Sequence, residues 1–173
     1  MQSLFKSLAS ANLMLLLIVA IWGCFPRASN ADVGGFDVLS GMTAVLCALF
    51  HSIVYTYFIA SGKFAETAVD ERGFPDRTVV GTVKGHKRQA FRYGFLAILG
   101  TMSAVFLYYA SSPVRGPDAI GNVWGIVGGF GMVLINLWAT LKEWKFVAAN
   151  GVLMDEILRV LGSGSAAPAP EAA

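Results

Sequence analysis

The sequence predicts an all-α integral membrane protein in which four helices cross the lipid bilayer and pack into one bundle. Only 14% of the 173 residues are charged, whereas a soluble domain has about 25%, and the mean hydropathy is +0.61. The charges also gather in a few polar segments between long apolar stretches, which is typical of a chain that uses lipid as its solvent. The formal net charge of +2 gives no indication of nucleic-acid binding.

Four apolar stretches are the candidates for the membrane-spanning helices. A helix needs about 20 residues to cross a hydrocarbon layer about 30 Å thick at 1.5 Å per residue. The expected spans cover residues 8–25, 36–61, 93–110 and 120–141. The second and fourth stretches reach the required length easily, and the third is slightly short but carries no charge.

The first stretch has two interpretations. Lys6 precedes an apolar run that ends at Pro26, and Ser29-Asn30-Ala31 places small residues where a signal peptidase cleaves, so this stretch also has the outline of a secretory signal. We favour a retained helix, which gives four spans; cleavage would leave three. The rest of the topology is the same in both cases.

The basic residues predict the orientation in the membrane. Eleven lysines and arginines lie before the first span, between the second and third spans, and after the fourth, whereas the other side has only Arg27 and Arg115. Because cytoplasmic loops carry the excess of basic residues, both termini and the long central loop are expected in the cytoplasm. The expected location is a cytoplasmic-type (inner) membrane.

The polar segments are expected to be largely helical. Residues 62–92 predict a cytoplasmic helical hairpin between the second and third spans, because residues 73–76 (Gly-Phe-Pro-Asp) mark a turn. Apolar residues at helical spacing predict an amphipathic helix over residues 142–161. The low-complexity composition of residues 162–173 is typical of a disordered tail, so residues 1–161 are expected to form the single bundle.

His51 is the candidate functional residue, because an ionisable side chain inside a membrane span is costly and is a functional hypothesis by default. It lies 12 residues, or about 18 Å, before Lys63, which suggests a position near the middle of the bilayer. Three roles remain open: a neutral imidazole that hydrogen-bonds between helices, an axial ligand of a b-type haem, and a proton relay.

A haem would need a second axial ligand. No other histidine lies in an expected span, so this ligand would be Met102, Met132 or a side chain of a partner chain. Glycines of the fourth span at a similar depth would allow a porphyrin to approach that helix. We expect no resident cofactor, with haem b as the alternative.

Small residues on two of the spans indicate close helix packing. They are Ser40, Ala44 and Ala48 in the second span, and Gly121, Gly125, Gly128 and Gly129 in the fourth. Asn136 is expected to hydrogen-bond to a neighbouring helix. The helix that packs against these residues belongs either to this chain or to another subunit.

The sequence shows no motif for catalysis or for a metal site. Cys24 and Cys47 lie in apolar runs without a neighbouring cysteine or histidine ligand pattern, and His51 is the only ionisable side chain expected inside the bilayer. The sequence therefore predicts no enzymatic activity and no bound metal.

The function that fits this pattern is that of a non-catalytic accessory, anchoring or assembly subunit of a larger membrane complex. Its expected partners are the lipid bilayer and other membrane subunits. One alternative is a haem-binding anchor subunit of a respiratory or photosynthetic electron-transfer complex. Another is a small oligomeric channel.

Overall fold

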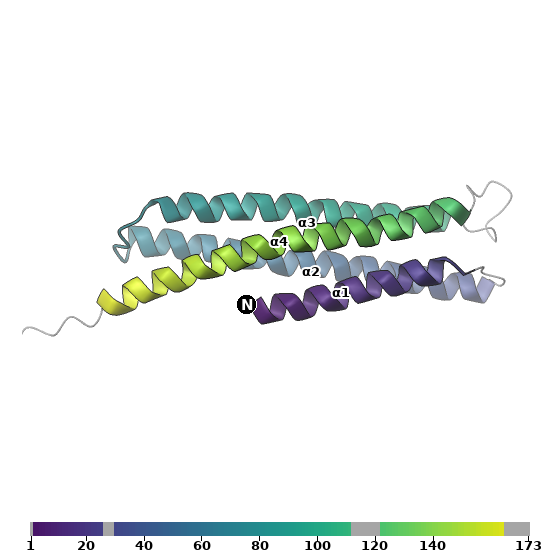
Figure 1. Cartoon of the computed structure of the whole chain (residues 1–173), viewed down its shortest axis with the longest axis horizontal. Helices are drawn as coiled ribbons and strands as arrows, with labels where there is room; N and C mark the ends of the chain where they lie inside the picture. The colour runs from purple at the N-terminus through teal and green to yellow at the C-terminus, as the bar shows by residue number, and fades with distance from the viewer. Residues whose placement is uncertain (1, 26–29, 112–121, 165–173) are drawn as a thin grey trace, which may run out of the picture.

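The described residues of the protein form four long helices that lie side by side in one elongated bundle (Figure 1). The computed structural model describes residues 2–25, 30–111 and 122–164. The helices are α1 (Gln2–Gly23), α2 (Asn30–Asp70), α3 (Thr78–Ala110) and α4 (Asn122–Gly164). All four are long and apolar enough to cross a membrane, which confirms the predicted class of a multi-pass helical membrane protein.

The spacing of the buried residues explains why the helices pack as a bundle. Buried positions follow one another mostly at intervals of four and three residues. In α1 they include Phe5, Ala9, Asn12, Leu16, Val19 and Gly23, and in α4 Met132, Asn136, Ala139, Glu143, Val147 and Asn150. A repeat near 3.5 residues keeps one stripe facing the neighbouring helices when they cross at a shallow left-handed angle.

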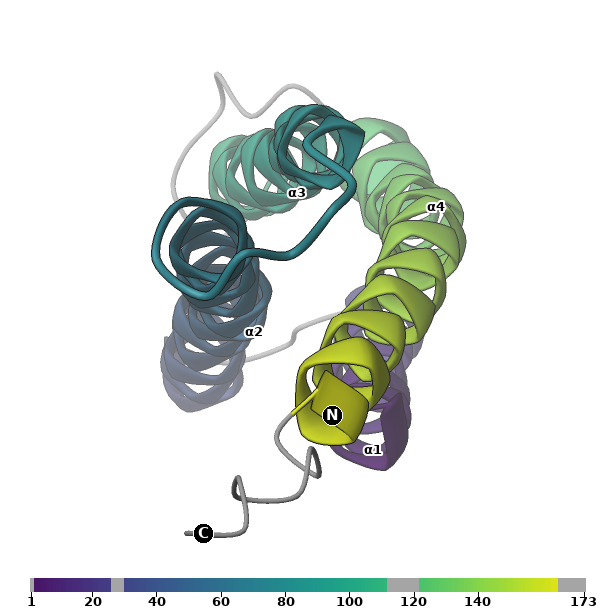
Figure 2. The same ribbon diagram turned by 90° about the vertical axis from the view of Figure 1, so that its left-hand side faces the viewer.

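The helices are arranged around the bundle so that α2 and α4 lie on opposite sides. Figure 2 shows α3 between them on one side, and the most extensive helix contacts are those of α3 with α4 and with α2. Direct contact between α2 and α4 is therefore limited, and any side chains that join these two helices must reach across the interior.

Three clusters of buried apolar residues follow one another along the bundle. The distal cluster contains Leu16, Val19, Phe36, Ala104, Tyr108 and Met132. The central cluster contains Phe5, Ala9, Phe50, Val54, Phe58, Ala90 and Val147. The hairpin-end cluster contains Ala65, Ala68, Val69, Phe74, Val79, Val83 and Ile157. Helix α1 contributes to the first two clusters only.

Helices α2, α3 and α4 continue beyond the start of α1 and form a three-helix extension around the hairpin-end cluster. A Cβ atom added at Gly151 would lie 3.4 Å from Nε2 of Gln2, so α1 begins level with Gly151. Figure 1 shows that the connection between α2 and α3 and the end of α4 both lie beyond this point. We call this the hairpin end.

The turn at the hairpin end uses the residues that the sequence suggested. Gly73 has a positive φ of 70°, which costs glycine little because it has no Cβ, and the N–H of Phe74 donates to the carbonyl oxygen of Ala68 at 2.9 Å. Oδ1 of Asp76 accepts hydrogen bonds from the hydroxyl of Thr78 at 2.7 Å and from its backbone N–H at 2.8 Å. These bonds lower the pKa of Asp76 and hold the turn just before α3.

Helix α4 differs from the prediction because it has no break after residue 141. It runs unbroken to Gly164, so the expected span and the expected amphipathic helix are one element, and residues 162–164 belong to the helix rather than to a tail. No proline interrupts this stretch. The predicted disordered residues 165–173 and Gly121 lie outside the described residues.

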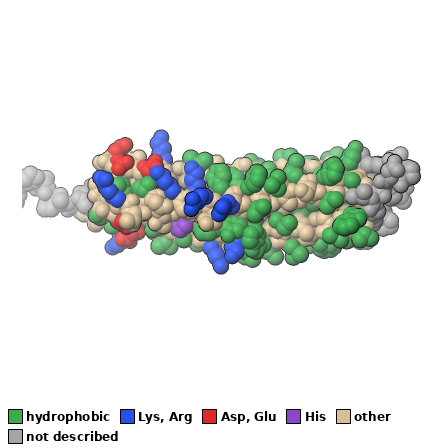
Figure 3. Space-filling model, turned by 90° about the horizontal axis from the view of Figure 1, so that it is seen from above, with side chains coloured by type: hydrophobic (Ala, Val, Ile, Leu, Met, Phe, Trp, Pro, Cys, Tyr) green, Lys and Arg blue, Asp and Glu red, His purple; other side chains and the backbone are tan. Residues whose placement is uncertain are grey.

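The surface changes character along the bundle. In Figure 3, apolar side chains cover most of the molecule away from the hairpin end, and the charged side chains gather toward the hairpin end. Apolar side chains such as Val45 and Phe106, each 68% exposed, face outward along the apolar part. This distribution suits helices whose outer faces contact lipid.

Candidate functional site

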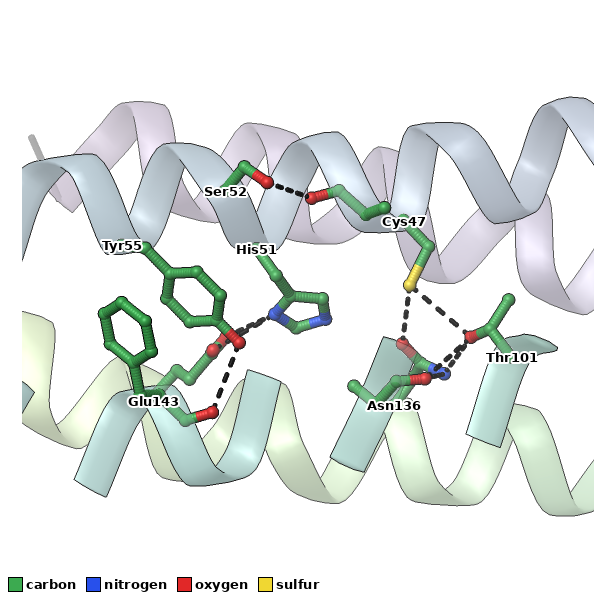
Figure 4. A network of polar contacts seen from close by, with 10 residues as sticks. Cys47, His51, Ser52, Tyr55, Thr101, Asn136 and Glu143 are labelled. Carbon is green, nitrogen blue, oxygen red and sulfur yellow. Dashed lines mark hydrogen bonds and ion pairs between the residues drawn. The ribbon is translucent and has the colours of Figure 1, made fainter. Parts of the chain in front are cut away.

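A buried His51–Glu143 pair lies in the interior of the bundle. Nδ1 of His51 is 3.0 Å from each carboxylate oxygen of Glu143 (Figure 4), and both side chains are completely buried. Glu143 is a buried ionisable partner of His51 that was not identified from the sequence. Burial of a histidine and a carboxylate is tolerated because each supplies the hydrogen-bond partner of the other.

The position of Glu143 on α4 explains why it points inward. It is seven residues from Asn136 and seven from Asn150, and both of these are also completely buried. Its neighbours Lys142 and Lys145 lie on more accessible positions of the same helix. The buried face of α4, which carries Asn136, Glu143 and Asn150, therefore continues through a segment whose sequence is polar.

Helix α3 leaves room for the pair at Gly94. A Cβ atom at this position would lie 2.6 Å from Oε1 of Glu143 and would overlap the hydroxyl of Tyr55. The Tyr55 hydroxyl donates to the carbonyl oxygen of Phe91 at 3.2 Å, and the two rings stack with centroids 4.0 Å apart. Gly94 is thus required by the close approach of two polar side chains.

The pair lies nearer the hairpin end than the sequence suggested. Nζ of Lys6 lies 4.8 Å from the ring centroid of Trp144, the residue after Glu143. The first charged residue of α1 is therefore level with the pair. Counting along α2 from His51 to Lys63 overstates how far His51 lies from the charged residues of the bundle. The reason is that α2 continues into the extension before it reaches a basic residue.

Cys47 and Asn136 form a second polar connection between α2 and α4. The Cys47 thiol donates to Oδ1 of Asn136 at 3.2 Å and lies 3.4 Å from Oγ1 of Thr101 on α3. Nδ2 of Asn136 donates to the same Thr101 oxygen at 2.9 Å. The prediction that Asn136 hydrogen-bonds to a neighbouring helix matches these contacts with two helices.

Asn150 makes a third connection closer to the hairpin end. Its Nδ2 donates to the Tyr57 hydroxyl at 3.1 Å and to Oγ of Ser61 at 2.9 Å. We call the three connections, Cys47–Asn136, His51–Glu143 and Tyr57/Ser61–Asn150, the polar ladder. Each of them joins α2 to α4, the two helices on opposite sides of the bundle.

The glycines of α4 pack against α3 of the same chain. A Cβ at Gly128 would lie 2.9 Å from Cδ1 of Leu107, and a Cβ at Gly125 or Gly129 would overlap Ser111 or Tyr108. The sequence left open whether the partner helix was internal, and these contacts identify it as α3.

The small residues of α2 are only partly used for packing. Ser40 and Ala44 are buried, but Ala48 is half-buried. Residues spaced four apart rotate about 40° per step around a helix of 3.6 residues per turn. A stripe of residues spaced four apart therefore moves away from the interior, whereas residues spaced alternately three and four apart stay on the buried face.

Several buried polar atoms have no hydrogen-bond partner among the described residues. They include Nε2 of His51, both amide atoms of Asn12 and Oγ1 of Thr140. Asn12 lines a cavity of about 100 Å³ between α1 and α2, whose other lining residues are apolar. Such atoms usually bind ordered water or a ligand.

The geometry around His51 meets only part of the requirement for a haem. An imidazole held by a carboxylate through one nitrogen, with the other nitrogen unpartnered, is the arrangement of many ligating histidines. However, Met132 lies in the distal cluster, eleven residues or about 16 Å along α4 from Glu143. Met102 is 57% exposed on the outer surface. Neither methionine can bind the far side of an iron held by His51.

Each connection of the polar ladder is a direct side-chain contact between α2 and α4. Within the described ranges, no three His, Cys, Asp or Glu residues gather as a metal site. No family model, curated protein or solved structure matches the chain.

Proposed function

We propose that the protein is a non-catalytic membrane subunit that anchors or assembles a larger membrane complex. The observation that carries this proposal is the three-helix extension. A span needs about 20 residues, whereas α2, α3 and α4 have 41, 33 and 43. The additional turns form a folded projection beyond the apolar region, which is a suitable docking surface for a partner.

The extension has the properties of a rigid and water-exposed platform. Its interior is the hairpin-end cluster, in which Ile157 of α4 is completely buried between α2 and α3. Its exterior carries ion pairs, with Lys84 2.8 Å from Glu66 and Arg159 2.7 Å from Glu156. Exposed pairs of this kind contribute little to stability, but they keep the surface soluble and available for recognition.

The polar ladder supports a structural role for the interior. Its members hydrogen-bond in pairs between α2 and α4, and buried polar connections of this kind can specify one helix arrangement. Toward the opposite end, the distal cluster fills the interior with apolar side chains. The polar ladder stops short of the distal cluster, which favours a locked bundle over a proton path through the chain.

The proposed orientation follows from the distribution of basic residues. The N-terminus, the α2–α3 connection and the end of α4 all lie toward the hairpin end (Figure 1). The excess of lysine and arginine lies there as well, so the positive-inside tendency favours a cytoplasmic hairpin end in an inner membrane.

Photo-crosslinking in the native membrane tests the proposal. A photoreactive residue replaces Leu158 or Arg72, which are exposed on the extension, or Phe106, which is exposed on the apolar part. We expect Leu158 and Arg72 to give one protein adduct of defined mass and Phe106 to give lipid adducts. Purification in mild detergent should yield a particle that contains a second protein in fixed stoichiometry.

Three results would contradict the accessory role. The first is a purified particle that contains only this chain, with crosslinks to lipid at every position. The second is a Soret absorbance that disappears in His51→Ala, which would establish the haem-anchor alternative. The third is conductance of the purified chain in planar bilayers, which would establish a channel.

A further inference from the structure

A groove between α2 and α3 lies where the apolar part of the bundle meets the extension. Its lining residues come from both helices: Ile59, Gly62, Lys63, Glu66, Val83, Lys84 and Lys87. This hollow has a volume of about 300 Å³. A second hollow of about 460 Å³ shares Lys84 and Lys87 and adds Arg88 and Phe91. We call the combined surface the basic groove.

The charged half of the basic groove has a clear excess of positive charge. Four basic residues border it, namely Lys63, Lys84, Lys87 and Arg88, against the single carboxylate of Glu66. Glu66 is paired with Lys84 at 2.8 Å, which leaves the other three for an anion. Figure 3 shows basic side chains gathered between the charged hairpin end and the mostly apolar part of the surface.

The other half of the basic groove is apolar and lies on the side toward the apolar part of the bundle. Ile59 is 52% exposed and Phe91 is 37% exposed, and Phe95 continues the same surface one turn farther along α3 at 59% exposure. The ring of Phe91 is held in place by its stacking on Tyr55. A ligand that fits both halves has an anionic head and an apolar tail.

The backbone of α2 leaves the floor of the groove open. A Cβ atom at Gly62 would meet only Cγ1 of Val83, at 3.9 Å. A headgroup could therefore approach the helix closely at this position, beside the flexible side chains of Lys63 and Lys87. Such cationic pockets at the edge of the hydrocarbon layer recognise the phosphates of anionic lipids.

We propose that the basic groove binds one anionic phospholipid. The phosphate lies among Lys63, Lys87 and Arg88, and an acyl chain runs along Ile59, Phe91 and Phe95 toward the apolar part of the bundle. The site is independent of the proposed role in assembly, because it needs only this chain and lipid.

Lipid titration followed by native mass spectrometry tests the site. The full chain is freed of lipid in a neutral detergent and titrated with phosphatidylglycerol or with phosphatidylcholine. We expect one phosphatidylglycerol to bind to the wild type well before phosphatidylcholine does. In the triple variant Lys63→Gln, Lys87→Gln, Arg88→Gln, the affinity for phosphatidylglycerol should fall roughly 100-fold, since each basic residue near a lipid surface contributes about 1 kcal/mol.

The matched control removes the same number of charges elsewhere on the exposed surface, in the triple variant Arg72→Gln, Arg77→Gln, Lys145→Gln. Its affinity should stay within about threefold of the wild type. Phe95→Ala, which keeps every charge, should weaken phosphatidylglycerol binding but not the binding of inorganic phosphate. Circular dichroism checks that each variant remains helical.

Three outcomes would overturn the proposal. Equal losses in both triple variants would show a general effect of net charge. Equal binding of phosphatidylcholine would show that the anionic head is not recognised. Displacement of the lipid by inorganic phosphate, together with no effect of Phe95→Ala, would assign the groove to a free phosphate ion instead.

Discussion

At the scale of single residues, His51 and Glu143 depend on each other because both are completely buried. Removing one partner leaves the other with an unsatisfied polar or charged group in an apolar interior. That loss is usually larger than the net value of the pair itself, since bringing both groups out of water was costly. The pair therefore fixes how α2 and α4 face each other.

We predict that His51→Ala lowers the free energy of unfolding by about 3–5 kcal/mol. Glu143→Gln should cost less, because its amide still hydrogen-bonds to Nδ1 of His51. The double variant His51→Leu, Glu143→Leu should regain most of the loss, since no buried polar group remains unpaired. Denaturation in detergent micelles, followed by circular dichroism, measures all three, and similar small effects in each would contradict a buried and coupled pair.

Gly129 offers a second test, with an internal control on the same helix. A Cβ at Gly129 would overlap the Tyr108 hydroxyl, whereas a Cβ at Gly131 would meet nothing within 4 Å. Gly129→Ala should therefore destabilise the protein by about 1–3 kcal/mol through overpacking. Gly131→Ala should be neutral or stabilising by up to about 1 kcal/mol, because alanine favours helix more than glycine does. Thermal unfolding of the two variants, measured side by side, tests this prediction. Equal midpoint temperatures would mean that α3 and α4 are not in close contact at Gly129.

The sequence allowed His51 to be identified but not its partner. His51 stands alone in a long apolar stretch, so its ionisable side chain is conspicuous, whereas Glu143 lies between Lys142 and Lys145 and looks like part of a solvated flank. A signal was present in the seven-residue spacing of Asn136, Glu143 and Asn150, which places all three on one face of a helix packed at a 3.5-residue repeat. Pairing them with α2 required the fold.

At the scale of helices, α1 is an integral part of the bundle. Phe5 and Ala9 belong to the central cluster, and Leu16 and Val19 belong to the distal cluster. Cleavage of α1 as a signal peptide would expose the buried faces of α2 and α4 that these residues cover. The packing therefore favours the retained helix over the cleaved signal.

We predict that the mature protein keeps α1. Proteolytic digestion of the protein purified from the membrane should yield peptides of α1, detected by mass spectrometry. Deletion of α1 should destabilise the remaining bundle, because side chains such as Phe50 would lose their packing contacts with α1, including the ring of Phe5. Detection of a mature N-terminus beyond residue 31 by mass spectrometry would show the opposite.

The extension should depend on its own small core. Ile157 is completely buried, whereas its neighbour Leu158 is 54% exposed. Ile157→Ala should destabilise the extension by about 2–5 kcal/mol, and Leu158→Ala should change it by no more than about 0.5 kcal/mol. Hydrogen exchange of the backbone amides near the hairpin end measures both. Equal exchange rates would mean that the three helices do not pack together there.

Hydropathy predicted the existence of the four helices but not where they end. The predicted boundary at residue 141 marks the point where Lys142 and Lys145 begin, which is a change in the surroundings of the helix. The backbone continues regardless, because this stretch contains no proline and Gly151 is tolerated within a long helix. A change from apolar to charged residues therefore does not mark the end of a helix.

At the scale of the whole molecule, the interior has two parts of different character. Polar connections join α2 and α4 from Cys47 to Ser61, and apolar side chains fill the opposite end. Neither part is visible from composition alone, because both are made from helices of similar hydropathy. Their order along the bundle became clear only once the four helices were aligned.

The two cysteines differ sharply in their surroundings, since Cys24 is exposed near the end of α1 and Cys47 is buried in the polar ladder. The native protein thus contains a buried thiol, Cys47, that can report opening of the bundle, and an exposed thiol, Cys24, that serves as a reference for labelling. A membrane-permeant maleimide should label Cys24 rapidly and Cys47 only when α2 and α4 separate, so labelling of Cys24→Ser would time that opening directly. Immediate labelling of Cys47 in the folded protein would show that α2 and α4 separate frequently without unfolding of the protein.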